Sequence, residues 1–131
     1  MQFIVEGVPV PKARPRFANG RAYTPKRTKD YEQKVREAYT GDMYPAGIPL
    51  KMLITAYFAI PKSATVKVSE EMIKGLIRPL KRPDADNIAK SITDALNGVA
   101  YADDKQIVRL TVAKYYSIWP RVEVEIDEVK A

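Results

Sequence analysis

Five aspartates crowd into positions 84 to 104 of this 131-residue chain, which carries eight aspartates in all and a net charge of +6. They are Asp84, Asp86, Asp94, Asp103 and Asp104. Carboxylates that lie close together repel one another and raise each other's pKa, so such a cluster is costly unless a cation lies among it. A divalent metal is the simplest such cation. A basic protein that holds a metal is suited to chemistry on a phosphate backbone.

The residue types that the chain lacks narrow this chemistry further. It has no cysteine and no histidine. These absences exclude disulfides, thiolate nucleophiles, zinc–thiolate sites and the Ser-His and Cys-His dyads. Any metal must therefore be held by oxygen ligands, which favours Mg²⁺, with Mn²⁺ as a substitute and Ca²⁺ as a non-productive replacement.

The basic charge is concentrated near the N-terminus. Residues 9–29 contain seven Lys and Arg side chains and no acid. One interpretation is a solvated surface loop. The other is an arm that contacts DNA phosphates, which the four arginines favour because the guanidinium fork matches phosphate geometry. On charge alone, the candidates for DNA binding are Lys12, Arg14, Arg16, Arg21, Lys26 and Arg27.

Around these residues, hydrophobic periodicity predicts the elements that position them. Residues 3–8 are expected to form a short strand, followed by an extended loop with a turn at Asn19-Gly20. Helical spacing of apolar residues predicts a helix from Pro25 to Thr40, with Thr24 as its N-cap. Residues 50–60 are apolar at odd and even positions alike, which predicts a central strand buried on both faces.

Further helices and strands are expected in the second half of the chain. A short helix is expected after Ser69, and residues 86–97 form a further helix that ends before Gly98. Residues 108–113 and 122–127 alternate apolar with polar residues, which predicts two strands joined as a hairpin near Trp119-Pro120.

This order of elements predicts one domain over residues 1–131. The expected fold is α+β: a small, mixed, mostly antiparallel sheet with helices packed on one side. No apolar run is long enough to span a membrane, and the first residues do not have the pattern of a signal peptide. A cytoplasmic protein is the expectation.

At about 100° per residue, the helix over residues 86–97 has two distinct sides. Its apolar side, which is expected to face the sheet, carries Ile88, Ile92, Ala95 and Leu96. Its polar side carries Asp86, Lys90, Asp94 and Asn97, with Asn87 nearby. Asp94 is expected to be solvated or paired with Lys90.

Ordinary structural roles also fit some of these acids. Asp84 or Asp86 taken singly suits a helix N-cap or first turn, where an acid contributes about 1 kcal/mol. Asp103-Asp104 taken alone suits a polar turn. Capping does not explain two aspartates, an asparagine and a lysine one turn later. Whether the loop after Gly98 brings Asp104 back to the helix is left open by the sequence.

Three segments together resemble the RusA family of Holliday-junction resolvases, with the family's spacing kept. They are Arg82-Pro83-Asp84-Ala85-Asp86-Asn87-Ile88-Ala89-Lys90, Asp94-Ala95-Leu96-Asn97-Gly98 and Asp103-Asp104-Lys105-Gln106-Ile107. The resemblance implies that Asp84, Asp86 and Asp104 bind Mg²⁺ and are catalytic, and that Lys90 is needed for activity. It also implies a homodimer of small α+β subunits with a basic face, often encoded by a prophage or phage.

One segment departs from the family pattern. Some members carry a Pro-Pro-Ser-x-Asn type element after the first strand, where this chain has Pro9-Val10-Pro11-Lys12-Ala13-Arg14-Pro15-Arg16. No individual DNA-contact residue is therefore carried over from those members.

The expected function is that of a Mg²⁺-dependent endodeoxyribonuclease that resolves four-way DNA junctions by paired symmetric cuts in recombination and repair. Two alternatives stay open. The chain could be a non-catalytic nucleic-acid-binding module, in which the acids cap a helix and fill a turn. It could also be a nuclease for branched DNA and flaps more broadly.

Overall fold

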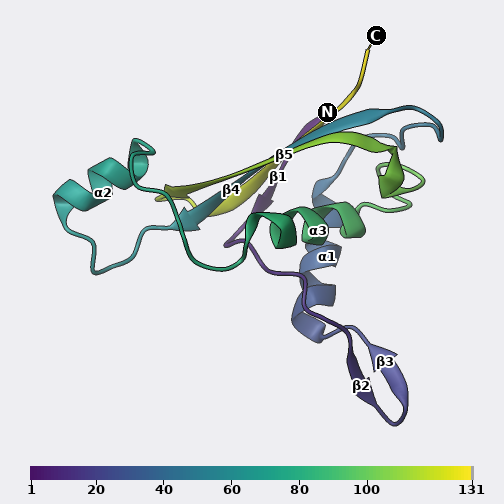
Figure 1. Ribbon diagram of the computed structural model, residues 1–131, viewed down its shortest axis with the longest axis horizontal. Helices are drawn as coiled ribbons and strands as arrows, with labels where there is room; N and C mark the ends of the chain where they lie inside the picture. Colours follow the sequence, from purple (N-terminus) through teal and green to yellow (C-terminus); the bar gives the residue numbers. More distant parts are fainter. Residues whose placement is uncertain (131) are drawn as a thin grey trace.

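The computed structural model describes residues 1–130 and contains a four-stranded sheet with α1 and α3 on one of its faces (Figure 1). In spatial order its strands are β1 (Gln2–Glu6), β6 (Arg121–Glu128), β4 (Leu50–Ala59) and β5 (Ile107–Ser117). The helices are α1 (Lys26–Ala38), α2 (Val66–Ile73) and α3 (Ala85–Ala95), with a 3₁₀ helix η1 (Asp104–Gln106). None of the helices in residues 1–130 has the length and apolar character that a bilayer crossing requires.

The sheet is mixed and mostly antiparallel, as predicted. β6 pairs antiparallel with both β1 and β4, whereas β4 and β5 run parallel. The predicted C-terminal hairpin was wrong, because β5 and β6 lie on opposite sides of β4 rather than beside each other. Alternating apolar residues indicate that a strand has one buried face, but they do not select its neighbour.

The core lies between one sheet face and the helices α1 and α3. In β4 the side chains of Leu50, Met52, Ile54, Ala56 and Phe58 are buried, while the intervening side chains are half-buried or exposed. The prediction that both faces of this strand are buried was therefore wrong. β4 is central in the sheet, and α1 and α3 cover one side of it; on the other side Lys51 and Leu53 are exposed, and Tyr57 is half-buried against Tyr115 and Arg121.

The helix α3 is held in this core by the side that the sequence predicts. Ile88 and Ile92 are at most 2% exposed, and Ala95 and Leu96 are buried beside them. Burying one such side chain contributes about 1.5–3 kcal/mol. Because this side faces the core, the orientation of the polar side of α3 is fixed.

The basic segment near the N-terminus forms more structure than the expected loop. Strands β2 (Arg16–Ala18) and β3 (Arg21–Tyr23) pair antiparallel across a turn at Asn19 and Gly20, both of which have positive φ. An Asn-Gly pair suits this turn because asparagine and glycine tolerate that backbone region. All eight residues of the hairpin are exposed, and Figure 1 shows it projecting away from the body of the protein.

The predicted helices differ from the observed ones mainly at their ends. α1 begins after Pro25, which occupies the N-cap position in place of Thr24. α2 begins near Val66 rather than after Ser69, because the Thr65 hydroxyl accepts a hydrogen bond from the Val68 amide at 3.2 Å and caps the helix there. α2 ends before Gly75, which has a φ of +79°.

Candidate active site

Two of the predicted catalytic carboxylates lie at the N-terminal end of α3. Asp84 occupies the N-cap position but its side chain makes no capping hydrogen bond, and Asp86 lies in the first helical turn. Both side chains are exposed. Within residues 1–130 neither carboxylate takes part in an ion pair. Capping by the side chain therefore does not explain Asp84, and both carboxylates are free to bind a cation.

Lys90 lies one turn further along the same side of α3. Its side chain is exposed and, in the part of the chain that the structure describes, it forms no ion pair. Asp94 is half-buried, and its carboxylate lies 3.6 Å from the ammonium of Lys12 rather than beside Lys90. The predicted pairing of Asp94 with Lys90 was wrong, because Lys12, in the segment between β1 and β2, lies against α3 at this point.

A short loop after α3 returns the chain to the helix. Gly98, with a φ of +77°, donates its amide hydrogen to the carbonyl of Tyr101 at 2.8 Å. The buried Tyr101 hydroxyl then donates to the carbonyl of Thr93 at 2.7 Å. These two bonds fix the loop against the C-terminal half of α3.

The two acids of this loop have different roles. Asp103 caps η1 by accepting a hydrogen bond from the Lys105 amide at 2.9 Å, which lowers the pKa of Asp103. The turn interpretation therefore holds for Asp103. Asp104 has the opposite environment. Burial, the neighbouring Asp103 and the charge of Asp94 raise its pKa, while the nearby Asn97 amide partly offsets that rise.

Gln106 anchors the loop that carries these acids. Its side-chain oxygen accepts hydrogen bonds from the amides of Ala102 and Asp103, and its side-chain nitrogen donates to the carbonyls of Pro45 and Ile48. The sequence resemblance included Gln106 but gave it no role. Its burial, at 9% exposure, follows from satisfying four backbone groups at once.

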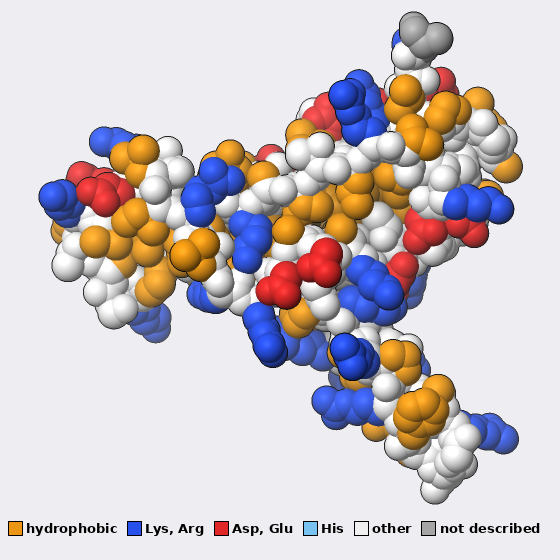
Figure 2. All heavy atoms as spheres, viewed as in Figure 1, with side chains coloured by type: hydrophobic (Ala, Val, Ile, Leu, Met, Phe, Trp, Pro, Cys, Tyr) orange, Lys and Arg blue, Asp and Glu red, His pale blue; other side chains and the backbone are white. Residues whose placement is uncertain are grey.

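The structure thus divides the predicted carboxylates between the two ends of α3. Asp84 and Asp86 lie at the N-terminal end, and Asp104 lies beside Asp94 near the C-terminal end. Asp94 comes eight positions after Asp86, which is about 12 Å along a helix axis. In residues 1–130 no three Asp, Glu, His or Cys side chains are grouped closely enough to hold one metal ion. Figure 2 shows acidic side chains over α3 and, apart from them, further acidic side chains by the loop beyond it, with basic side chains near both.

The six basic residues predicted to bind DNA fall into two classes. Arg14, Arg16, Arg21, Lys26 and Arg27 are exposed on or near the projecting hairpin. Lys12 differs from them, because its side chain is only 19% exposed and its ammonium lies between Glu32 and Asp94.

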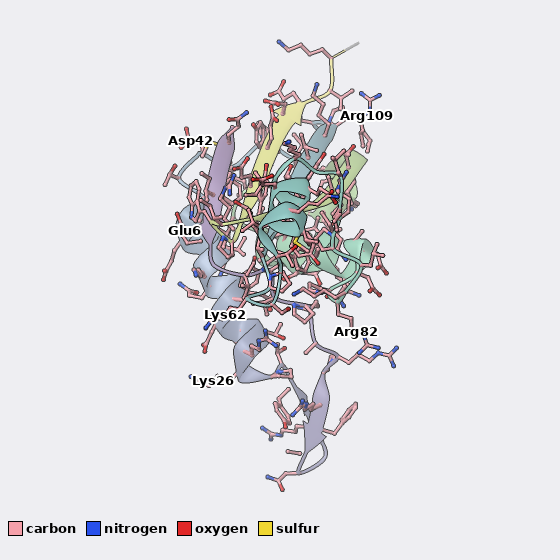
Figure 3. All side chains as sticks on the ribbon, turned by 90° about the vertical axis from the view of Figure 1, so that its left-hand side faces the viewer. Glu6, Lys26, Asp42, Lys62, Arg82 and Arg109 are labelled. Atoms are coloured by element: carbon pink, nitrogen blue, oxygen red, sulfur yellow. The ribbon has the colours of Figure 1, made fainter. Side chains whose placement is uncertain are left out.

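Two further basic residues border the site, and the sequence reasoning did not nominate them. Lys81 and Arg82 line a groove of about 370 Å³ together with Arg27, Phe58, Pro9 and Pro11. Figure 3 shows Arg82 extending outward in the half of the molecule from which the hairpin projects, on the same half as Lys26, whereas Arg109 lies at the opposite end. The sequence feature that could have identified them is their position two and three residues before Asp84.

Comparison with known proteins shows the family to which the chain belongs. Residues 6–127 match the family model described as endodeoxyribonuclease RusA. The chain is 41% identical over its whole length to the uncharacterized protein YqaN of Bacillus subtilis (strain 168), of which it covers 98%. It is 30% identical over 67% of its length to the crossover junction endodeoxyribonuclease rusA of Lactococcus phage r1t, of which it covers 61%. The family model covers nearly all of the chain, and the protein therefore belongs to the RusA endodeoxyribonuclease family.

Proposed function

We propose that this protein is a Mg²⁺-dependent endonuclease that resolves four-way DNA junctions by paired, symmetric cuts. Membership of the RusA family supports a junction-resolving nuclease, and the phage relative is named a crossover junction endodeoxyribonuclease. The observation that carries the proposal is that the carboxylates of Asp84 and Asp86 are exposed and, among residues 1–130, are used neither for capping nor for ion pairs. Lys81 and Arg82 precede Asp84 by three and two positions, and with Arg27 they are the charged residues that line an otherwise apolar groove.

The donor set suits a hard divalent cation. Asp84, Asp86 and Asp104 supply oxygen ligands, which Mg²⁺ prefers. Burial and the neighbouring acids Asp103 and Asp94 raise the pKa of Asp104, and a bound cation would offset this cost of its ionised form. When bound, such an ion lowers the pKa of a coordinated water and offsets charge on the phosphate in the transition state. RusA-family nucleases are metal-dependent in general, and Mn²⁺ is the expected substitute for Mg²⁺.

Lys90 is proposed to act beside these carboxylates. Its exposed ammonium lies on the polar side of α3, one turn after Asp86. A fixed positive charge there stabilises the negative charge that develops on the phosphate, or it orients the attacking water.

The separation of the acids supports a site that two copies of the chain complete. One copy would supply Asp84 and Asp86, and the other would supply Asp104. A four-way junction has two-fold symmetry and two strands to cut, which a homodimer with two equivalent sites matches. The ends of α3 are too far apart for one copy to hold a single ion with all three acids in the observed conformation.

DNA binding is proposed for the projecting basic segment and the adjoining groove. Arg14, Arg16, Arg21, Lys26 and Arg27 are exposed, so each guanidinium or ammonium can reach a phosphate. Phosphate contacts supply affinity without reading sequence, so binding should depend on DNA shape and fall steeply with salt. A symmetric pair of hairpins would present these charges to both sides of a junction.

The test is to incubate the protein with a labelled four-way junction, in Mg²⁺ or in EDTA, and to separate the products on a denaturing gel. Paired cuts in Mg²⁺ and none in EDTA are expected. Binding without cleavage under both conditions would instead indicate a non-catalytic nucleic-acid-binding module. Equal cleavage of a junction, a flap and a linear duplex would indicate a nuclease with broader substrates.

A further inference from the structure

Asn87, the residue after Asp86, binds the backbone of a residue 75 positions away. Its side-chain oxygen accepts a hydrogen bond from the Lys12 amide at 2.5 Å, and its side-chain nitrogen donates to the Lys12 carbonyl at 3.3 Å. One asparagine amide thus satisfies both polar backbone groups of Lys12. Aspartate cannot reproduce this pair because a carboxylate only accepts.

The side chain of Lys12 makes a second link at the same place. Its ammonium lies 3.3 Å from the Glu32 carboxylate on α1 and 3.6 Å from the Asp94 carboxylate on α3. Only 19% of the Lys12 side chain is exposed, so these ion pairs are partly shielded from solvent. Lys12 therefore joins the two helices that cover the sheet.

The next residue is tied to α1 as well. The Ala13 amide donates a hydrogen bond to the Thr28 hydroxyl at 3.2 Å, and Thr28 is 2% exposed. Residues 12 and 13 are thus held by α1 and α3 through backbone and side-chain bonds. Immediately beyond them the chain becomes exposed from Arg14 onward and forms the projecting hairpin.

We propose that Asn87 and Lys12 are positioning residues that fix the direction in which the basic arm leaves the protein. We define the arm as residues 14–24. Because Asn87 adjoins Asp86, the same clamp sets the arm relative to Asp86 and Lys90. DNA held by the arm is thereby presented to the catalytic groups in one orientation. This inference rests on the proposed nuclease function, and it assigns to Lys12 a role distinct from phosphate contact.

The first variants break the clamp and leave the charges of the arm intact. Asn87→Ala should bind a junction in EDTA with nearly wild-type affinity. Under saturating enzyme in Mg²⁺, its cleavage rate should fall by about tenfold or more, since small misplacement of a substrate is costly. Lys12→Met should likewise keep nearly wild-type affinity for the junction and lose cleavage rate. Lys12→Arg keeps a cation between the two carboxylates and should recover part of that rate.

A matched control separates positioning from general loss of stability. The Tyr44 hydroxyl donates to the Ile126 carbonyl at 3.0 Å, which is also a long-range side-chain-to-backbone bond, but far from the arm. Tyr44→Phe should lose stability to a similar extent in urea unfolding and keep the wild-type cleavage rate. Equal losses of rate in Tyr44→Phe and Asn87→Ala would overturn the inference.

The decisive comparison repeats Asn87→Ala in a protein whose Arg14, Arg16 and Arg21 are alanine. If Asn87 acts through the arm, its substitution should change the residual single-turnover rate by no more than about twofold in this background, because coupled residues are not additive. If Asn87→Ala lowered the single-turnover rate by the same factor in both backgrounds, the inference would be overturned. The proposed nuclease function would still stand in that case, provided that the wild-type protein cleaves the junction. Absence of cleavage by the wild-type protein would instead overturn the proposed function.

Discussion

Asp86 and Asp104 lie at opposite ends of α3, although the resemblance to the RusA family predicts that both belong to one site. Asp86 is in the first turn of the helix, and Asp104 is held beside Asp94 by the loop that Gln106 anchors. The burial of Ile88 and Ile92 fixes the helix that separates them. A conformational change within one chain that joined the two acids would have to release the loop that Gln106 anchors, whereas in the proposed shared site a second copy would supply Asp104 without that change.

Asp86→Asn should abolish cleavage of a four-way junction and leave junction binding unchanged or tighter. Asparagine keeps the size of the side chain but removes the charge that holds the cation and repels phosphate. Gel shifts in EDTA and product analysis in Mg²⁺ measure the two effects on the same preparation. Cleavage at the wild-type rate would remove Asp86 from the site.

Changing Arg14 and Arg16 together to alanine should reduce the magnitude of the slope of log affinity against log salt by about 2, because each phosphate contact that forms releases about one counterion. The matched control is Lys51→Ala with Arg109→Ala. These two side chains are exposed at the opposite end of the protein, and Figure 3 shows Arg109 there. The same change of slope in both double variants would mean that net charge, and not the arm, determines binding.

The sequence predicted those helices and strands whose buried side is marked by a local hydrophobic pattern. The apolar side of α3 and the alternating residues of β6 are examples, because each pattern repeats within a few residues. The β2–β3 hairpin was expected only as a loop with a turn. Its Asn-Gly signal was read correctly, but its flanking residues are exposed and carry no hydrophobic pattern.

Contacts between distant residues could not be predicted in the same way. The bonds from Asn87 to Lys12 and the placement of β4 between β5 and β6 depend on how separate elements meet. For the same reason the sequence left open where the loop would place Asp104. Its neighbour Asp103 was predicted more easily, because capping the adjoining 3₁₀ turn is a local interaction.

In EDTA, Asp104→Asn should be more stable than the wild-type protein at neutral pH. Burial and the nearby acids Asp103 and Asp94 raise the pKa of Asp104 above its ordinary value of 3.8 in the folded state. The folded state therefore binds this proton more strongly than the unfolded chain, and stability from Asp104 is lost as the pH rises through its folded pKa. Urea unfolding should show the gain at neutral pH and a smaller difference near pH 3.8.

Asp103→Asn provides a control of opposite sign. The hydrogen bond from the Lys105 amide lowers the pKa of Asp103, so its ionised form stabilises the folded state above its ordinary pKa and this contribution is lost as the pH falls. This variant should be less stable than the wild-type protein at neutral pH. A stability loss in Asp104→Asn as well would contradict the environment assigned to Asp104.

Gln106→Ala should lower the free energy of unfolding by about 1–3 kcal/mol, because buried backbone groups lose their partners. It should also slow cleavage, since the loop that carries Asp104 loses its anchor to Pro45 and Ile48. Gln33→Ala, on the exposed side of α1, is the matched control and should change stability by no more than about 0.5 kcal/mol. Wild-type cleavage by Gln106→Ala would show that the anchor does not matter for the reaction.

The most direct test of a site shared between two copies mixes two inactive variants, Asp86→Asn and Asp104→Asn, under conditions that exchange subunits. In a mixed dimer one site combines both substitutions, and the other keeps Asp84, Asp86 and Asp104 intact. An equal mixture should recover about a quarter of the wild-type sites and nick single strands of the junction. A mixture of Asp84→Asn with Asp86→Asn should stay inactive. If the Asp86→Asn and Asp104→Asn mixture formed mixed dimers that bind junctions but cut nothing, the shared site would be contradicted.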